Sequence, residues 1–172
     1  MNDFMTNLLL KTNCHFEFDN SNLNPITALK LKTSHIPNNA GLYFVFCDEN
    51  INPKQHLSFL IKNKTKNLIY FGKAGGLKKD GIKIKQGLNG RINNVVSDSL
   101  LKLKDIKRAK YWTIIMDNYK IQKLFVYCIE MDNPILTENK IYELLNVNNL
   151  EYPLLNKKLG RNLKVGQTTV II

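Results

Sequence analysis

Two short runs of aromatic and β-branched residues constrain the fold of this chain more than any other feature. The first run, residues 42–47, is Leu-Tyr-Phe-Val-Phe-Cys, and the second, residues 68–71, is Leu-Ile-Tyr-Phe. A glycine bounds each run, Gly41 before the first and Gly72 after the second. This composition is typical of buried strands. The chain is therefore expected to contain a sheet in which two strands each carry a tyrosine.

Three segments are predicted to be helical. Apolar residues at helical spacing predict a helix over residues 87–98, which places Arg91 near the face that packs on the sheet. Thr137 can cap a helix over residues 138–146. A short helix is expected at residues 4–10.

Three more segments are predicted to be strands. Residues 111–116 and 124–131 are strand-like and are expected to form a hairpin through Asp117 and Asn118. Residues 165–172 would form the last strand. Together with the helices, this pattern predicts an α+β fold with a small central, mainly antiparallel sheet that is flanked by helices.

The length of the chain indicates one domain with an N-terminal extension. Its 172 residues, of which 44% are hydrophobic, are enough for one proper core. An Asn- and Asp-rich patch at residues 19–24 is followed by Pro25 and Pro37, which interrupt regular secondary structure. Residues 1–38 are therefore expected to form a peripheral arm, and residues 39–172 the domain itself.

Several classes of protein are excluded by the sequence. The longest apolar stretches, such as residues 124–129, are far shorter than the roughly 20 residues that span a bilayer. The N-terminus lacks the features of a secretory signal, so no membrane partner and a cytoplasmic location are expected. The cysteines form no Cys-x-x-Cys pair and the histidines no metal-binding spacing, so any metal must be held by carboxylates.

The charge of the chain favours a nucleic-acid partner. The net charge is +11 and the isoelectric point is about 9.6. A solvated basic surface and an acidic protein partner are the alternatives. Residues 77–86 are expected to form a mobile basic loop or hairpin. Residues 102–110 contain a second basic cluster, and some of its side chains are expected to be merely exposed to solvent. In the loop, the lysines predicted to contact DNA are Lys78, Lys79, Lys83 and Lys85.

Four motifs occur in a characteristic order along the chain. They are Gly41-Leu42-Tyr43, Tyr70-Phe71-Gly72-Lys73, the helical Arg91, and a late glutamate followed by Pro153-Leu154-Leu155-Asn156. In this order they resemble the GIY-YIG nuclease family, over residues 36–158. Residues 48–66 would be an insertion, because the two tyrosines are farther apart than in the short hairpin of that family. Val95 stands where the family often carries histidine or tyrosine.

The resemblance implies roles for the motif residues in phosphodiester hydrolysis. Tyr43 or Tyr70 would act as the general base or position the attacking water, and Lys73 would supply positive charge beside them. Arg91 would also bind the non-bridging phosphate oxygens. As alternatives, both tyrosines would be ordinary core aromatics and Arg91 a solvated helix residue.

The remaining implied roles concern the metal and the architecture of the site. Glu143 would hold a single Mg²⁺, with Glu138 as the alternative ligand; Glu143 would otherwise be an ordinary exposed carboxylate. Asn156 would support the site or contact the DNA backbone. Gly41 and Gly72 would be structural glycines of the two motif strands.

The resemblance therefore implies a Mg²⁺-dependent endonuclease that cleaves double-stranded DNA. The compact chain is most like a sequence-specific type II restriction endonuclease, and cutting two strands suggests a homodimer. The arm, the insertion and the basic loop would supply sequence recognition. The alternatives are a structure-specific repair or mobile-element nuclease, and a non-catalytic nucleic-acid-binding protein on the same scaffold.

Overall fold

The computed structural model describes five stretches of the chain. They are residues 2–21, 24–49, 57–77, 81–99 and 101–156. The predicted strand at residues 165–172 and two of the predicted DNA-binding lysines, Lys78 and Lys79, lie outside these stretches.

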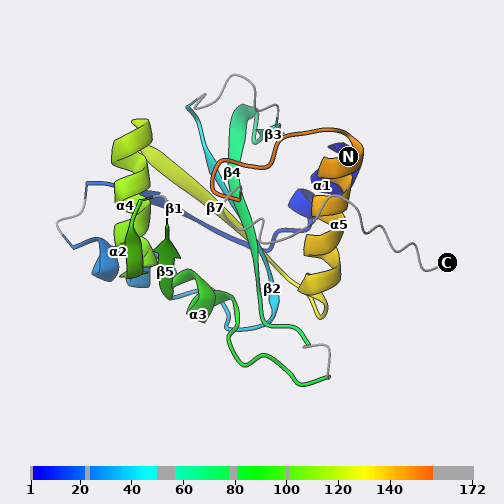
Figure 1. Cartoon of the computed structure of the whole chain (residues 1–172), viewed down its shortest axis with the longest axis horizontal. Coiled ribbons are helices and arrows are strands. Elements are labelled where there is room, and N and C mark those ends of the chain that lie inside the picture. Colours follow the sequence, from blue (N-terminus) through cyan, green and yellow to red (C-terminus); the bar gives the residue numbers. More distant parts are fainter. Residues whose placement is uncertain (1, 22–23, 50–56, 78–80, 100, 157–172) are drawn as a thin grey trace.

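One five-stranded antiparallel sheet forms the centre of the structure (Figure 1). Its strands are β1 (Cys14–Asp19), β2 (Gly41–Cys47), β3 (Ser58–Ile61), β4 (Lys64–Ala74) and β7 (Lys123–Glu130). Their order across the sheet is β1-β7-β2-β4-β3. The two motif strands, β2 and β4, are therefore neighbours.

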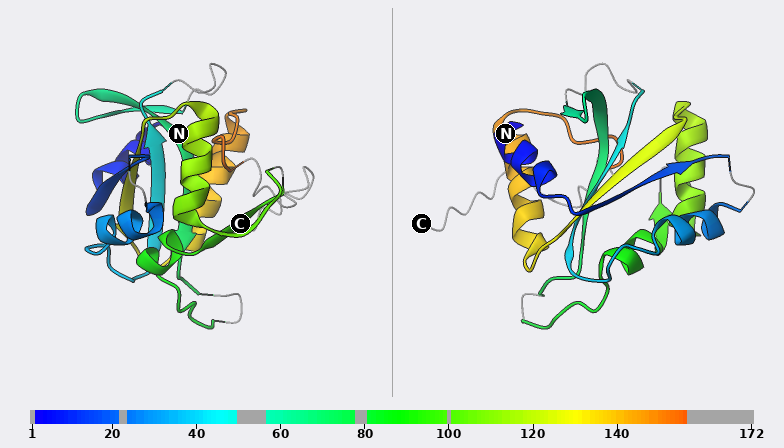
Figure 2. Two further views of the ribbon diagram at one scale, coloured as in Figure 1. Left: turned by 90° about the vertical axis from the view of Figure 1, so that its left-hand side faces the viewer. Right: turned by 180° about the vertical axis from the view of Figure 1, so that it is seen from behind.

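Helices cover both faces of this sheet, which confirms the predicted α+β fold. One face packs against α2 (Pro25–Lys32), α3 (Leu88–Ile92) and α4 (Arg108–Tyr119). The other face packs against α1 (Asn2–Leu10) and α5 (Pro134–Val147). Seen from behind in Figure 2, α4 and α5 stand at opposite sides of the sheet. No helix in the described part of the chain is long and apolar enough to span a bilayer.

Strand β2 is buried along its whole length because both of its faces are covered. Side chains alternate between the two faces of a strand. Tyr43 and Val45 join the core under α2, α3 and α4, whereas Leu42 and Phe44 join the core under α1 and α5. The face that carries Tyr43 is the one on which the candidate site is built.

The segment predicted as a strand at residues 111–116 is helical, and the predicted hairpin after it is absent. Trp112 and Met116 are buried four residues apart in α4, with Ala109 one turn before Trp112. This helical burial overrides the β-propensity of the aromatic and β-branched residues in between. The helix ends at Tyr119, and the next residue, Lys120, has a left-handed conformation with φ of 55°.

The helix predicted at residues 87–98 is shorter than expected. Helix α3 ends at Ile92, and the chain enters β5 (Val95–Asp98), which pairs with β6 (Leu103–Lys107) in a separate two-stranded sheet. The Asn93 side chain donates a hydrogen bond of 3.0 Å to the Asn89 carbonyl oxygen at this point. Arg91 stays on the helix, and Val95 does not.

The N-terminal residues are part of the packed domain and not a peripheral arm. Strand β1 pairs with β7 from Cys14 to Asp19. Phe16 and Phe18 are buried against Trp112 of α4, with ring centroids 6.4 and 5.7 Å from the tryptophan. The arm prediction failed because the edge position of β1 depends on β7, which lies more than 100 residues later.

The predicted insertion between the tyrosines contributes an edge strand. Strand β3 forms a hairpin with the start of β4, and the turn residues Lys62 and Asn63 both have positive φ, 49° and 61°. Two successive left-handed residues are characteristic of the tight turns that join antiparallel strands. The chain thus runs outward to β3 and returns to place β4 beside β2.

Candidate active site

Tyr43 and Tyr70 lie side by side on one face of the sheet. In the β2–β4 register Tyr43 is opposite Gly72, and Tyr70 is opposite Val45. The two hydroxyl oxygens are 3.5 Å apart and the ring centroids 5.6 Å apart. Both tyrosines are buried. The two motifs therefore bring a pair of phenols together.

Gly72 makes room for this pair. A β-carbon at position 72 would lie 2.7 Å from the Tyr70 hydroxyl oxygen and 2.8 Å from a carbon of its ring. Any larger residue would displace the Tyr70 side chain from its place along β4. Gly41 has a packing role in β2, because a β-carbon there would lie 2.2 Å from the Ile129 carbonyl oxygen.

A cleft of about 370 Å³ opens beside Tyr70. Arg91 of α3 and Arg108 of α4 both line it, and Asp98 and Tyr111 line it as well. Val95 is also at its wall. The cleft brings together residues from four elements, β4, α3, β5 and α4.

Arg108 is one of the cleft residues that the sequence did not predict, together with Asp98 and Tyr111. Its side chain is buried, with only 5% of the residue exposed, and its guanidinium carbon is 5.9 Å from the centroid of the Tyr43 ring. The prediction placed it in a basic cluster on a partly solvated face. The available signal was its chemistry, since Arg91, Arg108 and Arg161 are the only arginines of the chain.

Asp98 and Tyr111 form a buried pair in the wall of the cleft. The Tyr111 hydroxyl donates a hydrogen bond of 3.0 Å to Asp98 Oδ2, and the Leu101 backbone N–H donates one of 3.2 Å to Oδ1. Burial, followed by the charge of Asp98, raises the pKa of Tyr111. Tyr111 is therefore protonated at neutral pH and holds the Asp98 carboxylate in place.

Burial also raises the pKa of Tyr70 well above its usual value. The neighbouring Tyr43 adds to the increase, whereas Arg108 and then Arg91 oppose it. Tyr70 is consequently uncharged at neutral pH in the protein alone. A Tyr70 hydroxyl in this state can orient a water molecule, and an ionised Tyr70 needs additional positive charge in the cleft.

Lys73 is engaged with Glu138 of α5. The Lys73 ammonium and the Glu138 carboxylate form a close ion pair, and the Glu138 side chain is only 14% exposed. Glu143 is instead 60% exposed and pairs with Lys140 on the same helix at 3.1 Å. Of the two candidate metal ligands, Glu138 is therefore the one that lies beside the motif strand, and the choice of ligand between them stays a prediction. Ile141 and Leu145 face the sheet, and Glu138 shares that side of the helix.

Asn156 is buried and supports β4, which agrees with the predicted supporting role and contradicts the alternative that its side chain contacts DNA. Its side chain is buried and bonds both backbone groups of Phe71: it accepts from the N–H at 2.9 Å and donates to the carbonyl oxygen at 2.8 Å. The Leu155 N–H donates to the Ile69 carbonyl oxygen at 2.9 Å. These hydrogen bonds lie along the edge of β4 where β3 no longer pairs with it. They provide partners for backbone N–H and carbonyl groups of β4 that would otherwise be buried without a hydrogen bond.

The described lysines of the basic loop, Lys83 and Lys85, are exposed and line a second hollow near Gly76 and Gly87. A bridge between Leu77 and Lys83 holds the base of the loop. Neither lysine is among the residues that line the tyrosine cleft.

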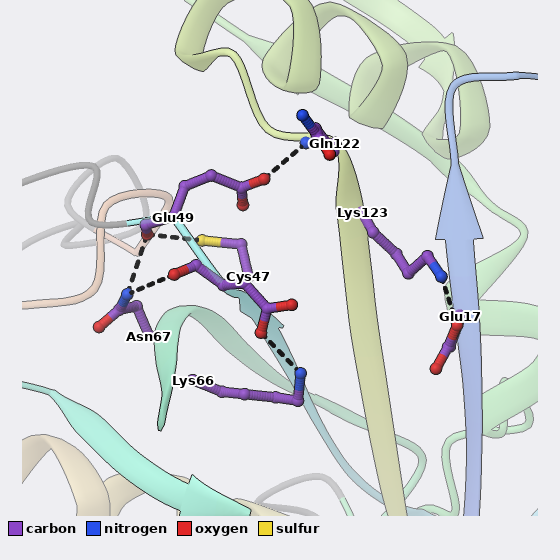
Figure 3. Close-up of polar contacts among 8 residues, drawn as sticks. Glu17, Cys47, Glu49, Lys66, Asn67, Gln122 and Lys123 are labelled. Carbon is purple, nitrogen blue, oxygen red and sulfur yellow. Dashed lines mark hydrogen bonds and ion pairs between the residues drawn. The ribbon is translucent and has the colours of Figure 1, made fainter. Parts of the chain in front are cut away.

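A third polar region lies where β2 ends, at the opposite end of that strand from Gly41 (Figure 3). Lys66 is buried, pairs with Asp48 at 2.7 Å, and lies 3.1 Å above the centroid of the Phe125 ring. Glu49 accepts a hydrogen bond of 2.8 Å from the Gln122 N–H. These contacts tie the end of β2 to β4 and β7, so the charges are used within the fold.

The described residues contain no group of three or more His, Cys, Asp or Glu side chains that could hold a metal ion. A metal held by such side chains in this part of the chain would therefore have at most two of them as ligands and would complete its shell with water, an arrangement that Mg²⁺ accepts. Glu138 meets this requirement better than Glu143, because its side chain is mostly buried and is held by a residue of the motif strand.

Comparison with models of protein families, with curated proteins and with solved structures finds no match to this chain.

Proposed function

We propose that this protein is a Mg²⁺-dependent endonuclease of the GIY-YIG type that hydrolyses double-stranded DNA. The observation that carries the proposal is the pair of buried tyrosine hydroxyls, 3.5 Å apart, beside a cleft that two arginines line. Phenols and guanidinium groups in one cleft suit the positioning of water and the neutralisation of a phosphate.

Hydrolysis of a phosphodiester requires a water oxygen to attack phosphorus while the bond to the leaving oxygen breaks. Tyr43 and Tyr70 orient this water, and the tyrosine that ionises accepts its proton. Arg91 donates hydrogen bonds to the non-bridging oxygens, whose charge grows in the transition state. The leaving oxygen takes a proton from solvent water as it departs.

The metal is assigned to Glu138. When bound, Mg²⁺ would supply charge neutralisation for a phosphate, although Glu138 belongs to α5, on the face of the sheet opposite to the tyrosine pair. Glu138 provides the protein oxygen ligand, and Lys73 holds the Glu138 side chain beside β4. Glu143, with its exposed carboxylate and its partner Lys140, has no such support from the motif strands.

DNA is the proposed substrate because of the charge of the chain. A net charge of +11 favours a polyanion and predicts binding that weakens strongly as salt is added. In the proposal the protein is a cytoplasmic, sequence-specific restriction endonuclease that cuts both strands as a homodimer. The exposed Lys83 and Lys85 then contact phosphates outside the cleft.

Plasmid cleavage tests the proposal. Purified protein is incubated with supercoiled plasmid in Mg²⁺ and in EDTA, together with the Tyr43→Phe variant and with branched oligonucleotides. Discrete plasmid fragments in Mg²⁺ alone, at least 100-fold slower in Tyr43→Phe, are expected. Cutting confined to branched DNA would replace restriction with a structure-specific role. DNA binding without any cutting would leave a non-catalytic binding protein.

A further inference from the structure

We propose that Arg108 acts with Arg91 to bind a phosphate group in the tyrosine cleft. This inference rests on the proposed function in one respect: the phosphate would belong to the DNA backbone. It adds a residue that lies outside the four motifs and comes from a different element, α4.

The first argument concerns burial without partners. Arg108 is 5% exposed, and the Nε atoms of both Arg91 and Arg108 are buried with no hydrogen-bond partner among the described residues. Burying a donor of a charged group without a partner is costly. Two such donors on arginines that line one cleft indicate an acceptor from outside the described part of the chain, which a bound anion would provide.

The second argument concerns the charge of the cleft. Two guanidinium groups line it, and among its described lining residues Asp98 is the one carboxylate. Both Asp98 oxygens already accept hydrogen bonds, from Tyr111 and from the Leu101 N–H. The cleft thus keeps an excess of positive charge, which an anion would neutralise.

The third argument concerns the position of Arg108 in its helix. It is the first residue of α4, where the helix dipole disfavours a cation. The first turn contains no acidic residue, and Lys107 at the cap makes no side-chain capping hydrogen bond. Helix stability therefore does not explain an arginine here, whereas recognition of an anion does.

Phosphate is the anion that this geometry suits. A guanidinium presents its donors in a planar fork that matches two phosphate oxygens, and two forks from separate elements enclose the group on two sides. The Arg108 guanidinium also lies near the Tyr43 ring. A bound phosphate is thereby held beside the tyrosine hydroxyls that the proposed reaction uses.

A titration with inorganic phosphate tests the inference without DNA or metal. Trp112 lines the cleft and is the only tryptophan of the chain, so its fluorescence reports on the site. The titration is done in EDTA, with chloride at matched ionic strength as the reference. Arg108→Gln is compared with Lys110→Gln, which removes the same charge from an exposed position of the same helix.

Saturable binding by the wild-type protein and by Lys110→Gln is expected, with at least tenfold weaker binding in Arg108→Gln. No saturable response in the wild-type protein, or equal affinity in the two variants, overturns the inference. If Arg108→Gln does not fold, Arg108→Lys decides: at least threefold weaker binding is expected, and wild-type affinity contradicts the role of the guanidinium.

Plasmid cleavage by the same variants separates this inference from the proposed function. Phosphate binding that depends on Arg108 in a protein that cuts no DNA would retain the anion site and reject the nuclease. Cleavage that is equal in Arg108→Gln and Lys110→Gln, together with equal phosphate affinity, would retain the nuclease and reject the site.

Discussion

At the scale of the residue, the chemistry of the cleft depends on the ionisation of Tyr70. Burial and the neighbouring Tyr43 raise the pKa of Tyr70, so the ionised fraction of this residue at neutral pH is small. As long as the pH stays below that pKa, the ionised fraction increases tenfold for each unit by which the pH rises. If the ionised phenol accepts the proton of water, cleavage should accelerate by about tenfold per unit between pH 6 and 9. Single-turnover rates at saturating Mg²⁺ measure this slope.

The Tyr70→Phe variant is the control for that profile. Its rate should be low and nearly independent of pH, because the titrating hydroxyl is gone. A slope that persists in Tyr70→Phe would assign the proton transfer to another group, with Tyr43 as the nearest candidate at 3.5 Å.

Two glutamates on one helix give the second prediction at this scale. Glu138→Gln should reduce cleavage at least 100-fold and raise the Mg²⁺ concentration that gives half of the maximal rate, because the proposed ligand loses its charge. Glu143→Gln, which removes the same charge from an exposed site, should change the rate less than threefold. Mg²⁺ titrations of plasmid cleavage compare the two, and the reverse order would return the metal to Glu143.

At the scale of the element, Asn156 completes the edge of β4. Asn156→Ala leaves the buried N–H and carbonyl oxygen of Phe71 without partners, so a loss of about 2–4 kcal/mol in the free energy of unfolding is expected. Urea unfolding followed by circular dichroism measures it. Asn148→Ala, which removes an exposed hydrogen bond to the Leu144 carbonyl oxygen, is the matched control and should cost less than about 1 kcal/mol.

DNA binding by the Asn156→Ala variant distinguishes a structural role of Asn156 from a direct contact with DNA. If Asn156 acts only through β4, the folded fraction of Asn156→Ala should bind DNA in EDTA with the affinity of the wild-type protein. A large loss of DNA affinity with unchanged stability would contradict the buried position of this side chain.

At the scale of the whole molecule, the N-terminal segment is expected to be essential for folding. Deleting residues 1–20 removes α1 and β1, including Phe16 and Phe18, which are buried against Trp112. It also exposes the edge of β7. The truncated protein should lose its near-ultraviolet circular dichroism and its cooperative thermal transition. A truncated protein that unfolds cooperatively near the wild-type temperature would restore the interpretation of this segment as an arm.

Much of the central sheet could be predicted from local pattern alone. The runs at residues 42–47 and 68–71 are strands β2 and β4, and the α+β class follows from strands and helices of this length. Period-two alternation within a strand and helical spacing within a helix extend over only a few neighbouring residues, so both patterns can be recognised in the sequence. The Tyr-Trp-Thr-Ile-Ile-Met segment in α4 shows the limit, because its burial on one side by distant elements outweighs its local β-propensity.

The sequence by itself determined the two strands, their tyrosines and the helical position of Arg91, since each depends on neighbours along the chain. Only the tertiary structure decided that Arg108 lines the cleft, that Glu138 and not Glu143 meets Lys73, and that Asn156 holds Phe71. These contacts join elements that are distant in sequence. Their geometry is set by how helices and strands cross in the packed core, and no local periodicity encodes that crossing.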